Sequence, residues 1–149
     1  MRIADVSDDS IVDGPGMRFV VFTQGCIRLC PECHNPQTQS MDGGRDASVD
    51  ELFERVRSNP LCSGLTLSGG EPFAQPGECA ELARRVRGIG KSVWCFSGYR
   101  LEELEDTANI PRTVAVKRRR RTKLDQHDPG FLDGQLVIEN DLGAHVDPR

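Results

Sequence analysis

The long segment between the apolar run Phe19–Phe22 and a helix start at Ser48 constrains the fold of this chain more than any other feature. It holds about two dozen residues with little periodicity, and loops of that length in compact domains are usually functional or disordered. Cys26, Cys30 and Cys33 lie in its first part with the spacing C-x3-C-x2-C. The fold must therefore carry a cysteine-bearing loop directly after this strand.

The chain around this loop alternates short apolar runs with amphipathic stretches. Ser48 with Glu51 three residues later predicts a helix start with a capping box. Gly88 and Gly90 are typical of a helix end. The predicted elements are strands at Phe19–Phe22, Leu65–Leu67, Ser92–Phe96, Thr113–Val116 and Leu136–Ile138, and helices from Ser48, around Cys79–Val86 and near Leu101 and Leu104.

This alternation predicts an α/β fold with a parallel sheet and right-handed crossovers. Functional groups in such folds gather at the carboxyl ends of the strands. We therefore expect the functional residues on three loops, which are residues 23–47, 68–75 and 97–100.

Length and composition limit the class of protein. A chain of 149 residues with 37% hydrophobic and 28% charged residues predicts one soluble globular domain. It is too short for a complete eight-stranded α/β barrel, which typically needs about 250 residues. The start of the chain lacks the basic and apolar regions of a secretory signal. Six cysteines are too few for a disulfide scaffold, so we expect reduced thiols and a cytoplasmic location.

The charge is unevenly distributed. The run KRRRRTK at residues 117–123 contains six of the 19 basic residues, and the rest of the chain has a net charge of −10. Only this run suggests nucleic-acid binding, and a solvated tail is the simpler interpretation. Docking to an acidic partner or polyanion, or a shift of reading frame, are the alternatives.

The cysteine triplet has three interpretations. Three buried packing cysteines do not agree with the polar residues around them. Structural zinc usually takes four ligands in two separated pairs, and His34 is awkwardly adjacent to Cys33 for that purpose. An iron–sulfur cluster held by three thiolates leaves one iron without a protein ligand, which gives the open position that catalysis requires. The sequence favours the cluster over zinc.

At this point the sequence resembles the radical S-adenosylmethionine enzymes, and among them the activating proteins of glycyl-radical enzymes, above all those of anaerobic ribonucleoside-triphosphate reductase. The matching stretches are DSIVDGPGMRF at residues 9–19, FTQGC at 22–26, CPECHNP at 30–36, LSGGEPF at 67–73 and WCFSGY at 94–99. Their order and number make the resemblance specific, whereas the cysteine spacing alone would not.

The resemblance implies two cofactors, a 4Fe–4S cluster and S-adenosylmethionine. Three irons of the cluster would be ligated by Cys26, Cys30 and Cys33, and the fourth would be chelated by the methionine part of S-adenosylmethionine. The motif Gly69-Gly70-Glu71-Pro72 would line that methionine end, with Glu71 offering charge to the ammonium group.

Four further residues take roles from the same resemblance. His34 would orient the cysteine loop, and Glu32 would lie near the adenine, where the family commonly has glycine or an aromatic residue. Asp13 and Gly14 have strong turn chemistry and could simply form a tight turn before the first strand; the alternative hypothesis is that they border the opening where the partner's glycine enters. Cys62, Cys79 and Cys95 are interpreted as small packing residues.

The implied reaction is the activation of a partner protein. A reduced cluster cleaves S-adenosylmethionine to a 5′-deoxyadenosyl radical, which abstracts hydrogen from a glycine of the partner. The implied partners are the catalytic subunit of anaerobic ribonucleoside-triphosphate reductase and a flavodoxin- or ferredoxin-like electron donor, without a membrane or nucleic acid. Activation of another glycyl-radical enzyme, a small-molecule radical enzyme, and a zinc-stabilised nucleic-acid-binding module are the alternatives.

The fold expected from the resemblance is a partial, open (β/α) barrel of the radical S-adenosylmethionine type. Residues 1–112 would form its core domain with a parallel sheet. Residues 113–149 would form a divergent, irregular C-terminal tail, because the resemblance fails after Arg112.

Overall fold

The computed structural model describes residues 1–100, 103–104, 116–118 and 136–138. In chain order the elements are β1 (Arg2–Ser10), β2 (Arg18–Thr23), the 3-10 helix η1 (Pro36–Thr38), β3 (Arg45–Asp46), α1 (Val49–Ser58), β4 (Gly64–Gly69), the 3-10 helix η2 (Pro72–Ala74), α2 (Pro76–Gly88), β5 (Ser92–Cys95), β6 (Val116–Arg118) and β7 (Leu136–Ile138).

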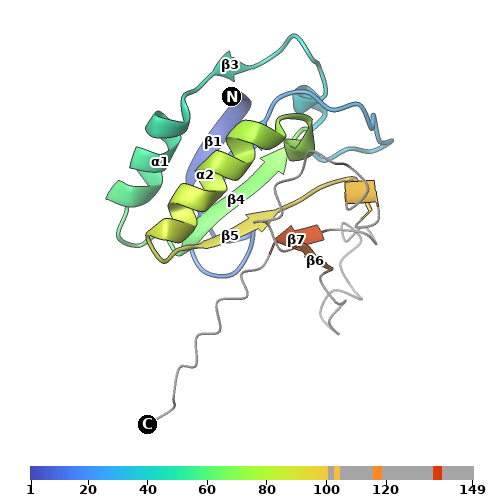
Figure 1. The fold of residues 1–149 in the computed structure, drawn as a ribbon. Helices are drawn as coiled ribbons and strands as arrows, with labels where there is room; N and C mark the ends of the chain where they lie inside the picture. The colour runs from blue at the N-terminus through green and yellow to red at the C-terminus, as the bar shows by residue number, and fades with distance from the viewer. Residues whose placement is uncertain (101–102, 105–115, 119–135, 139–149) are drawn as a thin grey trace.

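A five-stranded sheet forms the centre of the molecule, with the strand order β3-β1-β2-β4-β5 (Figure 1). Strands β2, β4 and β5 are parallel, as the alternation of strands and helices predicts. Strand β1 pairs antiparallel with both β2 and β3. The sheet is therefore mixed and open: the predicted parallel part is present in β2, β4 and β5, and β1 and β3 add an antiparallel edge.

The two short strands near the C-terminus form a separate antiparallel pair. Strand β7 confirms the strand predicted at Leu136–Ile138, and it pairs with β6. The strand predicted at Thr113–Val116 is observed as β6 at Val116–Arg118, and residues 113–115 lie outside the described residues. Most of the basic run, residues 119–123, also lies outside them.

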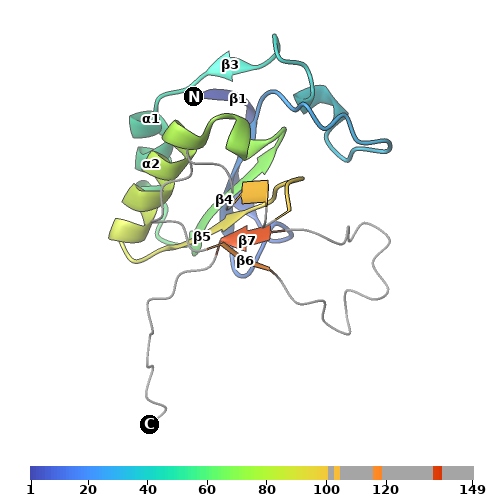
Figure 2. The same cartoon turned by 45° about the vertical axis from the view of Figure 1, so that its right-hand side comes forward.

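Both long helices cover one face of the sheet (Figures 1 and 2). Helix α1 begins after Ser48, whose side chain accepts a hydrogen bond from the Glu51 backbone N–H at 3.0 Å and so confirms the predicted cap. Helix α2 ends at Gly88, and residues 103–104 are helical as predicted for that region. Among the described residues, no helix has both the length and the apolar character that a membrane span requires.

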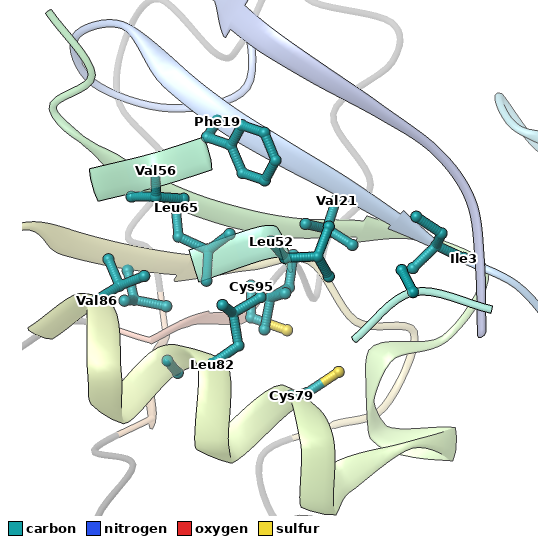
Figure 3. Packing of buried hydrophobic residues seen from close by; sticks show 14 of the residues in the cluster. Ile3, Phe19, Val21, Leu52, Val56, Leu65, Cys79, Leu82, Val86 and Cys95 are labelled. Atoms are coloured by element: carbon teal, nitrogen blue, oxygen red, sulfur yellow. The ribbon is translucent and has the colours of Figure 1, made fainter. Parts of the chain in front are cut away.

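The hydrophobic core lies between these helices and the sheet (Figure 3). The buried apolar cluster consists of Ile3, Phe19, Val21, Ala47, Leu52, Val56, Cys62, Leu65, Leu67, Cys79, Leu82, Ala83, Val86, Val93 and Cys95. Alternate residues of β2, β4 and β5 point into it, because successive side chains of a strand lie on opposite faces.

The other face of the sheet carries polar side chains at the same strands. Arg18 pairs in register with Gly64, and Val20 pairs with Thr66, which in turn pairs with Trp94. Paired residues of parallel strands share a face, so Arg18, Thr66 and Trp94 lie on the face away from the two helices. This second face becomes important for the loop between β1 and β2.

Replacement of Leu82 by alanine tests the packing between α2 and the sheet. Leu82 is fully buried, so we expect Leu82→Ala to lower the free energy of unfolding by about 2–5 kcal/mol. Leu61 is 70% exposed, and Leu61→Ala should change the same quantity by less than about 0.5 kcal/mol. Urea unfolding of both variants measures the difference, and equal losses would contradict this packing.

Candidate functional site

The three loops that the sequence selects meet at the carboxyl ends of the parallel strands. The backbone N–H of Glu71 donates to the carbonyl of Gly25 at 2.9 Å, and that of Gly70 donates to Thr23 at 2.8 Å. A Cβ atom added at Gly70 would collide with the Gly25 carbonyl oxygen. Only glycine therefore allows the loop after β4 to lie this closely against the start of the cysteine loop.

The base of the cysteine loop is fixed by backbone hydrogen bonds to the segment that returns from it. Gly25 N–H donates to Thr38 at 2.8 Å, and Cys26 N–H donates to Gln39 at 3.1 Å. The Gln24 amide donates to the Ser40 carbonyl at 2.6 Å. These bonds close the loop at its base, so residues 27–35 project from a fixed stem.

The three cysteines of this loop are accessible. Cys26 and Cys33 are half-buried, and Cys30 is exposed. Leu29 and Glu32 between them have φ values of 44° and 57°, so the backbone turns sharply at both positions. Within the described ranges, no three histidine, cysteine, aspartate or glutamate side chains are gathered closely enough to hold a metal ion. The structure places the thiols on one loop without bringing them into a finished ligand set.

The other three cysteines belong to the core, as the sequence predicts. Cys62, Cys79 and Cys95 are all buried, and Figure 3 shows Cys79 and Cys95 among the apolar side chains between α2 and the sheet. Burial raises the pKa of the Cys79 thiol to about 12 and also raises that of the Cys95 thiol well above its ordinary value. Cys79 and Cys95 stay protonated and are poor metal ligands, because thiolate is the ligand form.

Glu71 is the buried centre of the junction between the three loops. Its side chain is 1% exposed, and its two carboxylate oxygens accept hydrogen bonds from Phe73 N–H at 3.0 Å, Ser97 Oγ at 3.0 Å and Gly98 N–H at 2.9 Å. Burial raises the pKa of this carboxyl, while the donors and the Arg28 guanidinium act against the rise.

This environment bears on the role expected for Glu71. The described hydrogen bonds of the carboxylate come from the loops after β4 and β5, so Glu71 acts as a brace that connects these two loops. Ser97 and Gly98 belong to the motif WCFSGY, yet the sequence did not reveal their bonds to Glu71, because the residues lie 26 and 27 positions apart. Pro72 is buried and begins η2 directly after this brace.

Arg28 links the cysteine loop to the loop after β5. Its guanidinium stacks on the Tyr99 ring at 4.3 Å from the centroid and forms an ion pair with Glu103 at 2.9 Å. A Cβ atom added at Gly98 would lie 3.2 Å from Arg28 Cγ. The sequence did not single out Arg28. Because it lies between Cys26 and Cys30, its contacts attach the cysteine loop to the loop after β5.

Glu32 and His34 are both exposed on the far part of the loop. The φ of 57° at Glu32 falls in the left-handed region, which glycine adopts without steric cost. The roles of both residues near a cofactor stay predictions.

Asp13 and Gly14 lie in a loop that joins β2 at the opposite end from the cysteines. They belong to the loop of residues 11–17 that joins β1 to β2, whereas Cys26 follows the end of β2 (Figure 1). The loop folds back over the sheet, so that the Asp13 carbonyl accepts a hydrogen bond from Thr66, which pairs in register with Val20 of β2. Any partner segment that contacts both must therefore run along the sheet.

Comparison with known proteins agrees with this geometry. Residues 12–141 match the family described as 4Fe-4S single cluster domain. The pyruvate formate-lyase-activating enzyme of Clostridium pasteurianum is 44% identical over 80 residues, which are 50% of this chain and 34% of that protein. The anaerobic ribonucleoside-triphosphate reductase-activating proteins of Salmonella typhi and Escherichia coli K12 are each 33% identical, over 113 and 102 residues. These matches cover 70% and 63% of this chain and 73% and 66% of the relatives.

The chain therefore belongs to the 4Fe–4S single cluster family, among the radical S-adenosylmethionine activating proteins of glycyl-radical enzymes. It spans about a third of the length of the pyruvate formate-lyase-activating enzymes it matches. A 4Fe–4S cluster and S-adenosylmethionine are the cofactors that this membership gives the chain. The donor set fits the cluster, because three accessible thiols project from one fixed stem and the remaining three are buried.

Replacement of Glu71 by glutamine tests the brace between the loops. Glutamine presents an NH2 group where one carboxylate oxygen now accepts a hydrogen bond, so a donor loses its acceptor. We expect Glu71→Gln to lower the free energy of unfolding by about 1–3 kcal/mol at neutral pH. Glu78→Gln, on the half-exposed side chain near the N-terminus, is the matched control and should leave the value nearly unchanged. Urea titration followed by circular dichroism measures both.

The raised pKa of Glu71 also predicts a pH dependence. The folded state holds the proton of this carboxyl more tightly than the unfolded state, so its contribution to stability falls as pH rises from the ordinary value of 4.5 through the raised pKa. Glu71→Gln should remove this part of the pH profile, and Glu78→Gln should retain it. An unchanged profile in Glu71→Gln would show that Glu71 does not titrate in this range.

Proposed function

We propose that this chain is an activating enzyme that uses reductive cleavage of S-adenosylmethionine to generate the glycyl radical of anaerobic ribonucleoside-triphosphate reductase. The observation that carries the proposal is the direct junction between two loops. The loop with the C-x3-C-x2-C spacing and the loop with the Gly-Gly-Glu-Pro motif are joined by the hydrogen bond from Glu71 N–H to the Gly25 carbonyl at 2.9 Å. Ligands bound by the two loops would be neighbours.

The bound cofactors supply one-electron reduction of a sulfonium and hydrogen abstraction from a glycine Cα. Cys26, Cys30 and Cys33 would hold the cluster through three thiolates, which leaves one iron open to the second cofactor. Gly70 lies close to the backbone of Gly25 in the cysteine loop, and Gly69 lies close to the backbone of β2 at Phe22 and Thr23. The roles of the protein are to bind, orient and shield the two cofactors.

Glu71 takes a positioning role in this proposal, with Pro72 behind it. Its carboxylate fixes the loop after β5 at Ser97 and Gly98, and its backbone fixes the cysteine loop. A displacement of about 1 Å between reacting groups lowers rates steeply, so a buried brace between the two binding loops serves the chemistry. His34 and Glu32 would complete the outer side of the site from the exposed part of the cysteine loop.

The coverage of the relatives supports the reductase as the partner. The chain covers 73% and 66% of two reductase-activating proteins but only 34% and 32% of two pyruvate formate-lyase-activating enzymes. The aligned stretches are also longer, with 113 and 102 residues against 80 and 79. The electron donor in this proposal is a flavodoxin- or ferredoxin-like protein, and the location is the cytoplasm.

Cleavage of S-adenosylmethionine by cysteine variants tests the reaction. The protein, reduced under anaerobic conditions, should form 5′-deoxyadenosine, and Cys30→Ala should reduce the product to the level without protein because it removes a cluster ligand. Cys62→Ala is the matched control, since that thiol is buried in the core, and it should retain the activity. Product formation by Cys30→Ala at the control's rate would overturn the ligand assignment.

Replacement of Asp13 tests the proposed opening for the partner's glycine, which Asp13 and Gly14 would border. Asp13→Ala should raise the partner concentration for half-maximal glycyl-radical formation by about tenfold, as expected for the loss of one charged hydrogen bond. Asp9→Ala, an exposed carboxylate on the same hairpin, is the control and should have little effect. Electron paramagnetic resonance of the partner's radical gives the readout, and equal behaviour of both variants would contradict the role.

A further inference from the structure

The loop of residues 11–17 is anchored across the face of the sheet away from the helices. The Thr66 hydroxyl of β4 donates to the Asp13 carbonyl at 2.8 Å. A Cβ atom added at Gly14, where φ is 132°, would lie 3.4 Å from the Trp94 ring of β5. The loop leaves β1 and β2 and reaches over two further strands, and its tip presents Ile11 and Val12 with exposures of 77% and 86%.

A buried arginine lies beneath this anchor. Arg18 is fully buried, and its Nε donates to Thr66 Oγ1 at 3.1 Å, the same hydroxyl that holds Asp13. Its Nη1 donates to Ser92 Oγ at 2.6 Å and to the Pro15 carbonyl at 3.5 Å, and its Nη2 donates to the Leu65 carbonyl. The guanidinium thus connects β2, β4, β5 and the loop.

Among the described residues, no opposite charge compensates the charge of Arg18. In the part of the chain that the structure describes, no carboxylate lies within ion-pair distance of the guanidinium, and burial lowers the pKa of Arg18 to about 10. An unpaired buried cation is unfavourable compared with an apolar side chain. Its hydrogen bonds explain why an arginine occupies this buried position. One goes to Thr66, which holds the loop at Asp13, and another goes to Pro15 of the loop itself.

We propose that Arg18 and Thr66 are positioning residues that lock the 11–17 loop over the sheet in the place where it meets the partner. The inference rests on the proposed function and deepens it, because it states that buried residues outside the cofactor site hold the partner-facing loop in position. Arg18 begins β2 and Thr66 lies within β4, whereas the cysteines and Glu71 follow the carboxyl ends of these strands. Loosening the contacts of Arg18 and Thr66 with the loop should change how the partner binds and leave cleavage of S-adenosylmethionine alone.

Trp94 gives a direct readout of the loop position. It is the single tryptophan of the chain, and its ring lies beside Gly14, where an added Cβ atom would be 3.4 Å from it. Its fluorescence, and its quenching by acrylamide, therefore report on whether the loop covers the ring. This readout needs neither cofactor turnover nor partner.

The test compares Thr66→Val with Thr66→Ser in the full chain. Valine keeps the shape of the side chain but removes the hydroxyl, so it should raise acrylamide quenching of Trp94. It should also raise the partner concentration for half-maximal radical formation by about five- to tenfold, with partner-free formation of 5′-deoxyadenosine unchanged. Thr66→Ser retains the hydroxyl and should restore wild-type quenching and partner dependence.

Unchanged quenching and unchanged partner dependence in Thr66→Val would overturn the proposal. A loss of partner-free cleavage as large as the loss of radical formation would also overturn it, because it would indicate a general structural role. If Thr66→Val does not fold, Ser92→Ala removes a partner of Arg18 from an exposed side chain and should change quenching and partner dependence in the same direction. Failure of the proposed function can be distinguished from failure of this inference. If the wild-type chain does not cleave S-adenosylmethionine, the quenching of Trp94 can still be compared between the variants.

Discussion

The buried carboxylate of Glu71 is the interaction on which the rest of the site depends. It joins the loop after β4 to the loop after β5 through Ser97 and Gly98, and the backbone of the same residue joins the cysteine loop at Gly25. A carboxylate shielded from water is unfavourable unless its oxygens are bonded, and here three donors satisfy them. Glu71 therefore fixes the three loops that follow the parallel strands in one arrangement relative to one another.

The parallel strands separate two tasks at their two ends. At the carboxyl ends, Glu71 and Arg28 fix the loops that would carry the cofactors. Arg18 at the start of β2 and Thr66 within β4 fix the loop that would meet a partner. Both ends use a buried charged side chain bonded mainly to neutral groups of neighbouring loops and strands. The rigid sheet between them sets the distance from partner loop to cofactor site.

Local sequence signals predicted the parts of the fold that depend on short-range physics. The cap at Ser48, the apolar stripe of α2 and the parallel strands β2, β4 and β5 follow from residue spacing alone. The division of the cysteines into an accessible and a buried set also followed, because the flanking residues differ in polarity. Strand β1 was missed, because it is rich in aspartate and because Ile3 and Val6, which both pack on the core, are three residues apart across a register shift.

The partners of Glu71 and Arg18 could not be predicted, because they depend on contacts between distant positions. Ser92 follows Arg18 by 74 residues, and only the sheet register brings them together. A charged residue at the start of an apolar strand was the one available signal for Arg18. The Asp13–Gly14 turn was readable as a turn, but the position of its loop relative to the cysteines required the structure.

The central claim is that Cys26, Cys30 and Cys33 hold a 4Fe–4S cluster on a loop fixed by Glu71. Metal and acid-labile sulfide analysis of the anaerobically purified chain tests it most directly. The claim predicts about four iron atoms and about four sulfides per chain. About one zinc atom per chain with neither iron nor sulfide would contradict it.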